Sequence, residues 1–584
     1  MTGRGARMEQ GKAFTLHVTD LNHSGEGVGR KDGRVVFVPY AAPGDVAVVR
    51  ITEERRGFSR AELLSLERES PDRVPPPCPV YLRCGGCQLQ HISYEAQLAY
   101  KRRRVEQALR RIGKFDDVPV GDCLPAPAVF HYRNKARFSY CTCRDGPGLG
   151  LGLGLGLGPG DGSGGAAGDG HAQGAKCGGE RSGFASGFYG RRTHDVVDFS
   201  ECLIQHRTNN EVFQALNALL VRYGIPIWNG ASGGPAAAGA GGVCGATRGL
   251  RWEPGQARAR VSRKGALKHL VVRCNRDGEQ ALAVLIPAGG RLDEAERIAD
   301  ELMAAVPKLV GVIEAVEEPG STGRGGATLE PGQPGQVSGG LSQPRCAGAR
   351  LVKGESFFRE RILGLEFVVS ADSFLQVNPE GMEVLYREVL RAAGLSGGEV
   401  ALDAYCGVGS ISLVLARECG QVFGIEEVGS AVADARRNAR LNHLENCTFI
   451  AGRVEDVLSA RFGFGIDAGV VAEVPASLPY REAGGREDAP GRGTREIREA
   501  SVLPRHVDVA VLAPPRAGCD ARALQALALL EPSRIVYVSC DPETLARDLR
   551  ILAGIGYRPT LVQPVDMFPQ TSHVESVVRL NRAV

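Results

Sequence analysis

The sequence predicts an α/β protein with a doubly wound parallel sheet in its C-terminal part. A small β-barrel is expected at the N-terminus, and a β-rich region between the two. Three observations support this prediction. Strand-like and helix-like segments alternate from about residue 372 onwards. Residues 10–68 hold short runs of alternating apolar and polar residues, and residues 130–285 contain β-rich segments broken by low-complexity stretches.

The N-terminal runs are short, and glycine-rich turns separate them. Apolar and polar residues alternate over residues 14–18, 34–39 and 46–51. This pattern is typical of a small barrel. Small barrels often hold single-stranded nucleic acid, so RNA or DNA is one expected ligand. A barrel that serves only for packing or dimerisation is the alternative.

Composition sets few limits on the partners of this chain. It has 584 residues, 78 of them glycine, and a net charge of only +3. Basic residues are grouped locally, at 101–104, 110–111 and 133–137, and the first two groups lie in an expected amphipathic helix over 93–114. Such groups bind phosphates or simply form solvated helix faces. No apolar signal core or membrane-length apolar run occurs, so we expect a cytoplasmic protein without a membrane partner.

Four inserts interrupt the central and C-terminal parts, at about 145–183, 229–249, 317–348 and 474–500. They lack hydrophobic periodicity, and we expect them to be disordered surface loops. Three of the sixteen cysteines, Cys177, Cys244 and Cys346, fall inside them and are poor candidates for metal ligands.

In the C-terminal part, predicted strands alternate with predicted helices. Expected strands are 400–403, 422–425, 507–512, 535–538 and 576–580. Expected helices are 384–393, 410–419 and 430–442. Strands that alternate with helices form parallel sheets, whose ligands bind at the carboxyl edge.

Three cysteines lie close together as Cys78-x5-Cys84-x2-Cys87, with two glycines between the last two. This spacing allows them to surround one metal centre, and Cys202, which follows a predicted strand, is the best candidate for a fourth ligand. Four thiolates suit zinc or an iron–sulfur cluster, and the spacing leaves the choice open.

A glycine loop, Asp403-x-Tyr405-Cys-Gly-x-Gly409, joins a strand to a helix. Glycines allow the backbone to approach a ligand closely. Glu426 ends the next strand, where a carboxylate can bind ribose hydroxyls. The loop fits either S-adenosylmethionine or a dinucleotide. Because no second phosphate-binding feature is present, S-adenosylmethionine is favoured.

Three further motifs follow predicted strands or precede one. Ala513-Pro-Pro-Arg516 forms either a rigid turn or a phosphate contact through its arginine. Cys540 ends the next strand at the ligand edge and is a candidate nucleophile. Glu575 precedes the last strand and is a candidate base, although a lone acid there is more often a solvated residue.

Together these residues resemble the RNA uracil-5 methyltransferase family, and most closely its 23S rRNA type. The resemblance covers nearly all of the chain outside the inserts. The motifs that carry it, besides the four cysteines, are residues 21–29, 373–378, 403–409, 539–542 and 573–575. It implies an OB-like TRAM barrel, a β-rich central iron–sulfur domain and a Rossmann-like class I methyltransferase sheet. The corresponding domains would be 1–70, 71–350 and 351–584.

The resemblance also implies a role for each candidate residue. Gln376, Tyr405 and Glu426 would contact S-adenosylmethionine. Cys540 would add to C6 of the uracil, and Glu575 would then remove the C5 proton. The metal ligands of a [4Fe–4S] cluster would be Cys78, Cys84, Cys87 and Cys202. RNA, a single-stranded or looped part of 23S rRNA, would be the partner, and no obligate protein partner is expected.

One residue departs from the family pattern. The family usually has Asp-Pro-Pro-Arg, and Ala513 replaces the aspartate. Because that acid lies in the cofactor pocket of the family, a non-catalytic RNA-binding protein is one alternative. Methylation of the tRNA T-loop is a second alternative, and an iron–sulfur redox protein is a third.

Overall fold

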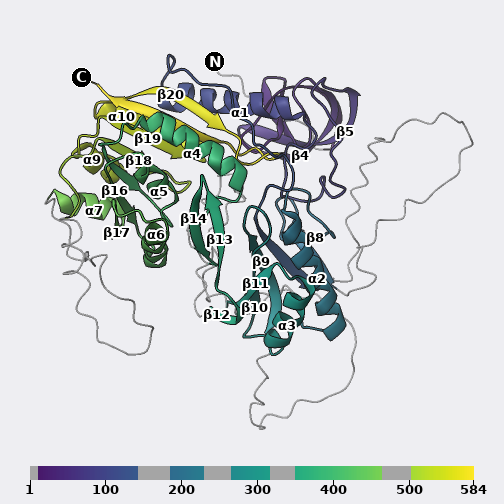
Figure 1. Cartoon of the computed structure of the whole chain (residues 1–584). Coiled ribbons are helices and arrows are strands. Elements are labelled where there is room, and N and C mark those ends of the chain that lie inside the picture. Colours follow the sequence, from purple (N-terminus) through teal and green to yellow (C-terminus); the bar gives the residue numbers. More distant parts are fainter. Residues whose placement is uncertain are drawn as a thin grey trace, which may run out of the picture.

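The computed structural model describes residues 11–142, 184–228, 265–315, 349–371, 373–462 and 502–583. These residues form an N-terminal barrel, a central sheet and a C-terminal sheet, which follow one another along the chain (Figure 1). The four predicted inserts, together with Cys177, Cys244 and Cys346, lie outside the described residues. Every described helix is too short or too polar to reach across a lipid bilayer.

The N-terminal barrel is closed, as predicted, with the strand order β1-β2-β3-β5-β4. Its strands are β1 (Ala13–Leu21), β2 (Gly27–Lys31), β3 (Arg34–Val38), β4 (Val46–Glu54) and β5 (Phe58–Arg68). Alternate residues, such as Leu16 and Val18 or Val36 and Val38, point into one apolar core. At Gly29 a Cβ atom would lie 2.6 Å from the carbonyl oxygen of His17, so β1 and β2 approach as closely as they do only with glycine there.

The central region is a seven-stranded sheet with the order β12-β11-β10-β9-β6-β7-β8. Its strands are β6 (Lys135–Thr142), β7 (Phe184–Tyr189), β8 (Val196–Asp198), β9 (Ala266–Cys274), β10 (Ala281–Ala288), β11 (Leu309–Glu314) and β12 (Arg350–Gly354). Two helices, α2 (Arg207–Tyr223) and α3 (Ala295–Ala305), pack on it and share its apolar core. The sequence prediction of a β-rich region is correct for the sheet but missed α2, which carries apolar residues at helical spacing.

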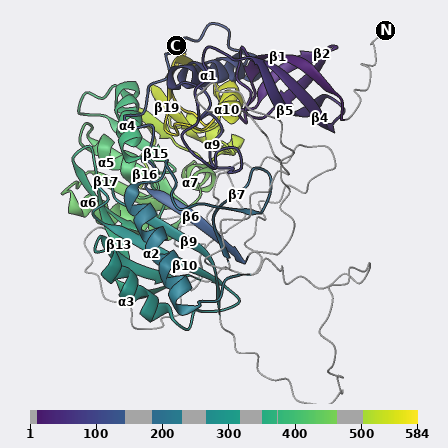
Figure 2. The same ribbon diagram turned by 90° about the vertical axis from the view of Figure 1, so that its right-hand side faces the viewer.

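Helix α1 (Tyr94–Ala108) continues as a π-helical turn, η1 (Leu109–Gly113), so helical structure covers the predicted span 93–114 almost completely. Ser93 caps the helix by accepting a hydrogen bond from the Ala96 N–H. The helix lies beside the barrel and against the C-terminal sheet (Figures 1 and 2). Val105 and Leu109 enter the same apolar core as the strands of that sheet.

The C-terminal sheet also has seven strands, in the order β17-β16-β15-β18-β19-β21-β20. Its strands are β15 (Val400–Ala404), β16 (Gln421–Glu426), β17 (Cys447–Ala451), β18 (Val509–Leu512), β19 (Arg534–Ser539), β20 (Tyr557–Val565) and β21 (Glu575–Arg582). The helices are α4 (Pro379–Ala393), α5 (Ser410–Ala416), α6 (Gly429–Leu441), α7 (Val454–Arg461), α9 (Ala521–Ala528) and α10 (Pro542–Gly554). A hairpin of β13 (Phe357–Ile362) and β14 (Leu365–Ser370) precedes α4.

Both faces of this sheet are covered. Alternate residues of β18 belong to different apolar cores: Val509 and Val511 to one, Ala510 and Leu512 to the other. Helices α4, α5 and α6 contribute to the first core, and α1, α7, α9 and α10 to the second. Strands buried on both faces are apolar throughout, which explains the continuous hydrophobic runs in the sequence.

The sheet differs from the prediction in one respect: it is mixed and not wholly parallel. Strands β15 to β19 pair in parallel, but β21 runs antiparallel to both β19 and β20. The segment that joins β20 to β21 contains no helix. Without a crossover helix the chain turns back on itself, and an antiparallel pair results. This reversal brings the start of β21 to the end of β19.

Candidate active site

Cys540 follows the last residue of β19 and is half-buried. The next residue, Asp541, caps α10 by accepting hydrogen bonds from the backbone N–H groups of Glu543 and Thr544, at 3.1 and 3.0 Å. Burial raises the pKa of the Cys540 thiol to about 12, and the charge of Glu575 acts in the same direction, whereas Arg516 lowers it. The thiol lies at the carboxyl edge of the sheet, near one carboxyl group and one guanidinium group.

Glu575 is the first residue of β21, and only 3% of its surface is exposed. Ser539 and Ser576 are paired across β19 and β21, so the residues one step beyond them, Cys540 and Glu575, are the next opposite positions. Burial raises the pKa of Glu575 to about 7, against the opposing charge of Arg516. A carboxyl group with this pKa can both accept and release a proton near neutral pH.

Arg516 belongs to the loop that follows β18. The hydroxyl of Thr544 donates a hydrogen bond of 3.1 Å to the Arg516 carbonyl oxygen, which fixes the loop against α10. The positive charge of Arg516 reaches three groups: it lowers the pKa values of Cys540, Glu575 and His573. Sequence reasoning assigned Arg516 to a phosphate or a turn, and missed its place beside the thiol.

The glycine loop follows β15. Asp403 is fully buried, and its Oδ2 accepts a 2.6 Å hydrogen bond from the Ser412 hydroxyl. Its Oδ1 has no hydrogen-bond partner among the described residues. Burial raises the pKa of this carboxyl to about 7. Tyr405 has a φ of 72°, a left-handed conformation that is uncommon outside glycine and indicates a constrained loop.

Glu426 ends β16 beside the glycine loop. Its carboxylate accepts backbone N–H hydrogen bonds from Gly407 at 3.1 Å and from Val428 at 2.8 Å. Burial raises its pKa, and these two hydrogen bonds lower it. Tyr405, half-buried, lies near Cys519 of the loop after β18. The predicted residues Tyr405 and Glu426 thus lie on one loop system at the same sheet edge as Cys540.

Gln376 lies in the segment between the β13–β14 hairpin and α4 and is half-buried. Asn378 caps α4 by accepting from the Gly381 N–H and donates a 3.1 Å hydrogen bond to the carbonyl oxygen of Met567. That contact ties the segment of Gln376 to the connection that leads into Glu575. In the same segment Phe374 is 61% exposed, which is unusual for an aromatic ring.

The basic residues of α1 and η1 divide into buried and exposed members. Lys101 is fully buried; its Nζ lies 2.6 Å from Oδ1 of Asp566, and it also donates to the Phe568 carbonyl oxygen. Arg104 binds Glu543 at 2.9 Å. Both residues hold α1 against the C-terminal sheet region, so they are not available to a nucleic-acid phosphate. Among the other basic residues of the span 101–114, the exposed ones are Arg103, Arg110, Arg111 and Lys114.

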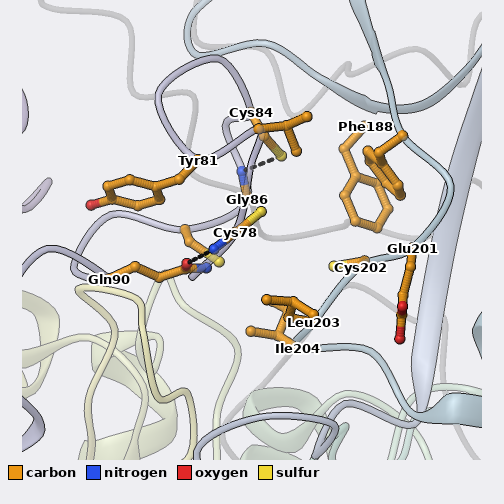
Figure 3. A pocket seen from close by; sticks show the side chains of 13 residues that line it. Cys78, Tyr81, Cys84, Gly86, Gln90, Phe188, Glu201, Cys202, Leu203 and Ile204 are labelled. Carbon is orange, nitrogen blue, oxygen red and sulfur yellow. Dashed lines mark hydrogen bonds between the residues drawn. The ribbon is translucent and has the colours of Figure 1, made fainter. Parts of the chain in front are cut away.

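The four predicted metal ligands line one small cavity between the 78–90 segment and the segment after β8. Figure 3 shows the sulfur atoms of Cys84 and Cys202 on two sides of this space, with Phe188 near both. Cys78 and Cys87 line the same cavity. Burial, with a smaller contribution from the neighbouring thiols, raises the pKa of Cys84 to about 11 and that of Cys202 to about 12.

The thiols encircle a space and do not converge on one point. Within the described ranges, no three His, Cys, Asp or Glu side chains are arranged to hold a single metal ion. The remaining lining is mostly apolar, and it includes Tyr81, Phe188, Phe199 and Ile204. The structure thus gathers the predicted cysteines, including the distant Cys202, in one cavity.

Comparison with known proteins identifies the class of the chain. Residues 7–64 match the TRAM domain, residues 395–480 match a methyltransferase domain, and residues 496–583 match the tRNA (uracil-5-)-methyltransferase domain. These matches define a methyltransferase with an N-terminal TRAM barrel. The crystal structure of a Pyrococcus abyssi tRNA (uracil-54, C5)-methyltransferase in complex with S-adenosyl-L-homocysteine has the same fold. Its TM-score is 0.60 at 23% identity, with 97% of this chain and 100% of that chain covered.

Full-length relatives then give the family. An uncharacterized RNA methyltransferase of Halalkalibacterium halodurans is 32% identical over 580 residues, which cover 99% of each chain. Another from Listeria monocytogenes serotype 4b is 31% identical over 574 residues, 98% of each chain. The chain belongs to this family of RNA methyltransferases, as its resemblance to uracil-5 methyltransferases predicts.

Proposed function

We propose that this protein methylates C5 of a uridine in 23S rRNA with S-adenosylmethionine as the methyl donor. The single observation that carries the proposal is the juxtaposition of Cys540 and Glu575 at the end of paired strands β19 and β21. Uracil C5 is a weak nucleophile, and addition of a thiolate at C6 makes it reactive. A thiol and a base on the same side of one sheet edge meet that requirement.

The residues divide the reaction between them. Cys540 adds to C6, and the electrons of the C5–C6 double bond move onto C5 and the C4 carbonyl. S-adenosylmethionine supplies the methyl group. Glu575, with a pKa of about 7, then takes the proton from C5, the double bond forms again, and the Cys540 sulfur leaves. Arg516 favours the thiolate, because its charge lowers the pKa of Cys540.

The site also fits the donor. Asp403 presents a buried Oδ1 without a hydrogen-bond partner among the described residues, and a donor group of a ligand would satisfy it. Glu426 lies at the end of the second strand, where ribose hydroxyls are bound in sheets of this type. We assign the cofactor contacts to Gln376, Tyr405 and Glu426, and the sheet to the Rossmann-like class I type.

The cysteine cavity fits a [4Fe–4S] cluster better than a zinc ion. The thiols of Cys78, Cys84, Cys87 and Cys202 line one cavity without converging on one point, whereas a zinc site needs them around one point. The reaction transfers no electrons to or from the protein, so a cluster there would be structural. Iron and acid-labile sulfide analysis of anaerobically purified protein tests this assignment, and stoichiometric zinc would contradict it.

A tRNA substrate is the second candidate. The solved structure that shares the fold over 97% of this chain is named as a tRNA (uracil-54, C5)-methyltransferase. The exposed basic residues on α1 and η1, such as Arg103 and Arg110, suit either RNA, because phosphate contacts carry no sequence information.

One experiment separates the two substrates. The protein is incubated with labelled S-adenosylmethionine and, in parallel, with undermethylated 23S rRNA or undermethylated tRNA. Label in 5-methyluridine of the rRNA alone supports the proposal, and label in the tRNA alone replaces it with the second candidate. Absence of label in both, with full binding of S-adenosylmethionine by calorimetry, would contradict the catalytic assignment.

A further inference from the structure

The segment that joins β20 to β21 leads into Glu575, and one of its residues has an unusual backbone conformation. Gln570 has a φ of 68°, a left-handed value that residues other than glycine rarely adopt, and only 5% of its surface is exposed. Such a conformation persists where the surrounding groups hold it in place, and it is found preferentially at functional sites. The contacts of Gln570 therefore show what holds the connection that leads to Glu575.

The polar groups of Gln570 bind residues from the N-terminal part of the chain. Its backbone N–H donates to Oε1 of Gln97 at 3.0 Å, and its own side-chain Oε1 accepts from Nε2 of Gln97 at 3.1 Å. Its backbone carbonyl oxygen accepts from the N–H groups of Gln88 and Leu89, both at 3.0 Å. Backbone and side chain of Gln570 are thus held from both sides by segments far away in the sequence.

Gln97 lies on α1, and only 1% of its surface is exposed. Besides binding Gln570, its Nε2 donates to the carbonyl oxygens of Leu89 and Ile92, at 3.1 and 2.9 Å. This one buried amide therefore joins three segments: α1, residues 88–92 and the connection between β20 and β21. Because an unpaired buried amide is costly, these partners specify one arrangement of the three segments.

Backbone carbonyl oxygens on either side of Gln570 also accept hydrogen bonds from side chains of the N-terminal part. The three pairs are Lys101 with Phe568 at 3.1 Å, Tyr132 with Pro569 at 3.0 Å, and Arg104 with Ser572 at 2.9 Å. The connection is therefore fixed against α1 and its neighbours along most of its length. It ends at Glu575, the position opposite Cys540.

We propose that Gln97 is a positioning residue for the base Glu575. It does not touch the reacting atoms, but it holds Gln570 in the left-handed conformation that directs the chain toward Glu575. Removal of the C5 proton requires the carboxylate within hydrogen-bond reach of that proton, and a small displacement slows this step strongly. The inference rests on the proposed function, in which Glu575 removes the C5 proton.

The test compares Gln97→Leu with the wild type as full-length proteins. The substrate is undermethylated 23S rRNA, or undermethylated tRNA if that is the RNA labelled in the assay above, with tritium at C5 of its uridines. Turnover should fall by about 10- to 10²-fold, with KM for S-adenosylmethionine unchanged. The methylated covalent adduct should accumulate and tritium release should slow, because methyl transfer precedes the step that Glu575 performs. A general loss of structure would slow formation of the adduct as well.

Asn446→Leu is the matched control, because it also removes a bridging amide. Asn446 precedes β17 at the opposite edge of the sheet, and its Nδ2 donates to the carbonyl oxygens of Ala416 and Cys419, at 2.8 and 3.1 Å. Asn446→Leu should lower thermal stability without raising the share of protein in the adduct. A Gln97→Leu protein with the adduct share and tritium release of the wild type overturns the inference.

A second variant decides if Gln97→Leu fails to fold. Glycine adopts a φ of 68° without strain, so Gln570→Gly keeps the turn and loses only the side-chain contact with Gln97. Its adduct share should rise in the same direction by a smaller amount, and the wild-type value would overturn the inference. A Glu575→Gln protein that forms no adduct overturns the role of Glu575 and this inference together, whereas a wild-type result for Gln97→Leu leaves the proposed function intact.

Discussion

The chain presents thiols in two different environments. At the catalytic edge Cys540 is a single half-buried thiol with Arg516 and Glu575 beside it. In the cysteine cavity four thiols surround one largely apolar space and raise one another's pKa values. Both environments disfavour a free thiolate because of burial, but they offer different ways of compensating its charge.

The comparison shows that the groups around a cysteine decide which reactions its thiol can undergo. A single thiol with an arginine and a proton acceptor can ionise transiently, react and be released. Four facing thiols cannot all ionise without shared positive charge, which a metal cluster supplies permanently. Exchange of one residue in each place should therefore have separate consequences.

The largest effect is expected for Cys540→Ala. Removal of the nucleophile should reduce methylation by at least about 10⁴-fold, since the other groups cannot substitute for the covalent step. Turnover with labelled S-adenosylmethionine measures this, and metal content should stay that of the wild type. Cys447→Ala is the matched control, because Cys447 begins β17 at the opposite edge of the sheet. An active Cys540→Ala protein would show that Cys540 is not the nucleophile.

Glu575→Gln should have the next largest effect, roughly 10²- to 10⁴-fold on turnover, because general base catalysis contributes about that much. The covalent RNA adduct should accumulate, since the C5 proton is no longer removed. Denaturing gel electrophoresis detects the adduct. Wild-type turnover should rise with pH through about 7, where Glu575 ionises, and the variant should lack that step. Loss of turnover without any adduct would point to a different role for Glu575.

The pKa of Glu575 also predicts how the folding stability depends on pH. Its pKa of about 7 in the folded protein exceeds the value of about 4.3 expected for an unfolded chain. The folded state therefore binds more protons between these values, and folding stability falls as pH rises through this range. Glu575→Gln removes that loss, roughly 4 kcal/mol. The variant should unfold at a higher temperature than the wild type at pH 8, and by a smaller margin at pH 5.

The sequence was sufficient to predict the barrel and the gathering of Cys78, Cys84, Cys87 and Cys202. The barrel follows from alternation, and the grouping of Cys78, Cys84 and Cys87 follows from their spacing, which are local properties. Cys202 was assigned to this group because it follows a predicted strand and because of the resemblance to the family. The place of Arg516 beside Cys540 was missed, although it follows from the parallel pairing of β18 with β19. The place of Glu575 opposite Cys540 depends on the antiparallel return of β21, whereas the alternating pattern of strands and helices pointed to a parallel sheet.

Helix α2 and the buried Lys101 show two other limits of structure prediction from the sequence. The apolar residues of α2, among them Val212, Phe213 and Leu216, have helical spacing, so the sequence does indicate this helix. The prediction missed it because the surrounding region has the pattern of β-strands. Lys101 stands in a run of basic residues that suggests phosphate contacts. Its burial against Asp566 requires the approach of a segment 465 residues away, which no local pattern encodes.

Cys202→Ser tests the role of the cysteine cavity. Loss of one ligand is expected to lower the iron content and the thermal stability, because metal binding is coupled to folding. Turnover per folded molecule should fall only several-fold, since Cys540 and Glu575 remain in place. Iron analysis and the methylation assay on the same sample test this. Turnover as low as that of Cys540→Ala in folded protein would show that the cavity takes part in the chemistry.

The smallest effect concerns Ala513, the residue that follows β18 where the family usually has aspartate. Ala513 is half-buried against the core, and its N–H reaches the Ala404 carbonyl oxygen next to the glycine loop. In Ala513→Asp a carboxylate there could accept a hydrogen bond from the cofactor, worth about 1.5–3 kcal/mol. We expect KM for S-adenosylmethionine to fall by about tenfold, with turnover nearly unchanged.

Without the cofactor the Ala513→Asp variant should be less stable, because Asp403 is buried nearby. Ala517→Asp, on the exposed part of the same loop, is the control. Equal KM values for both variants would show that position 513 does not face the cofactor, and that the alanine is neutral in this chain.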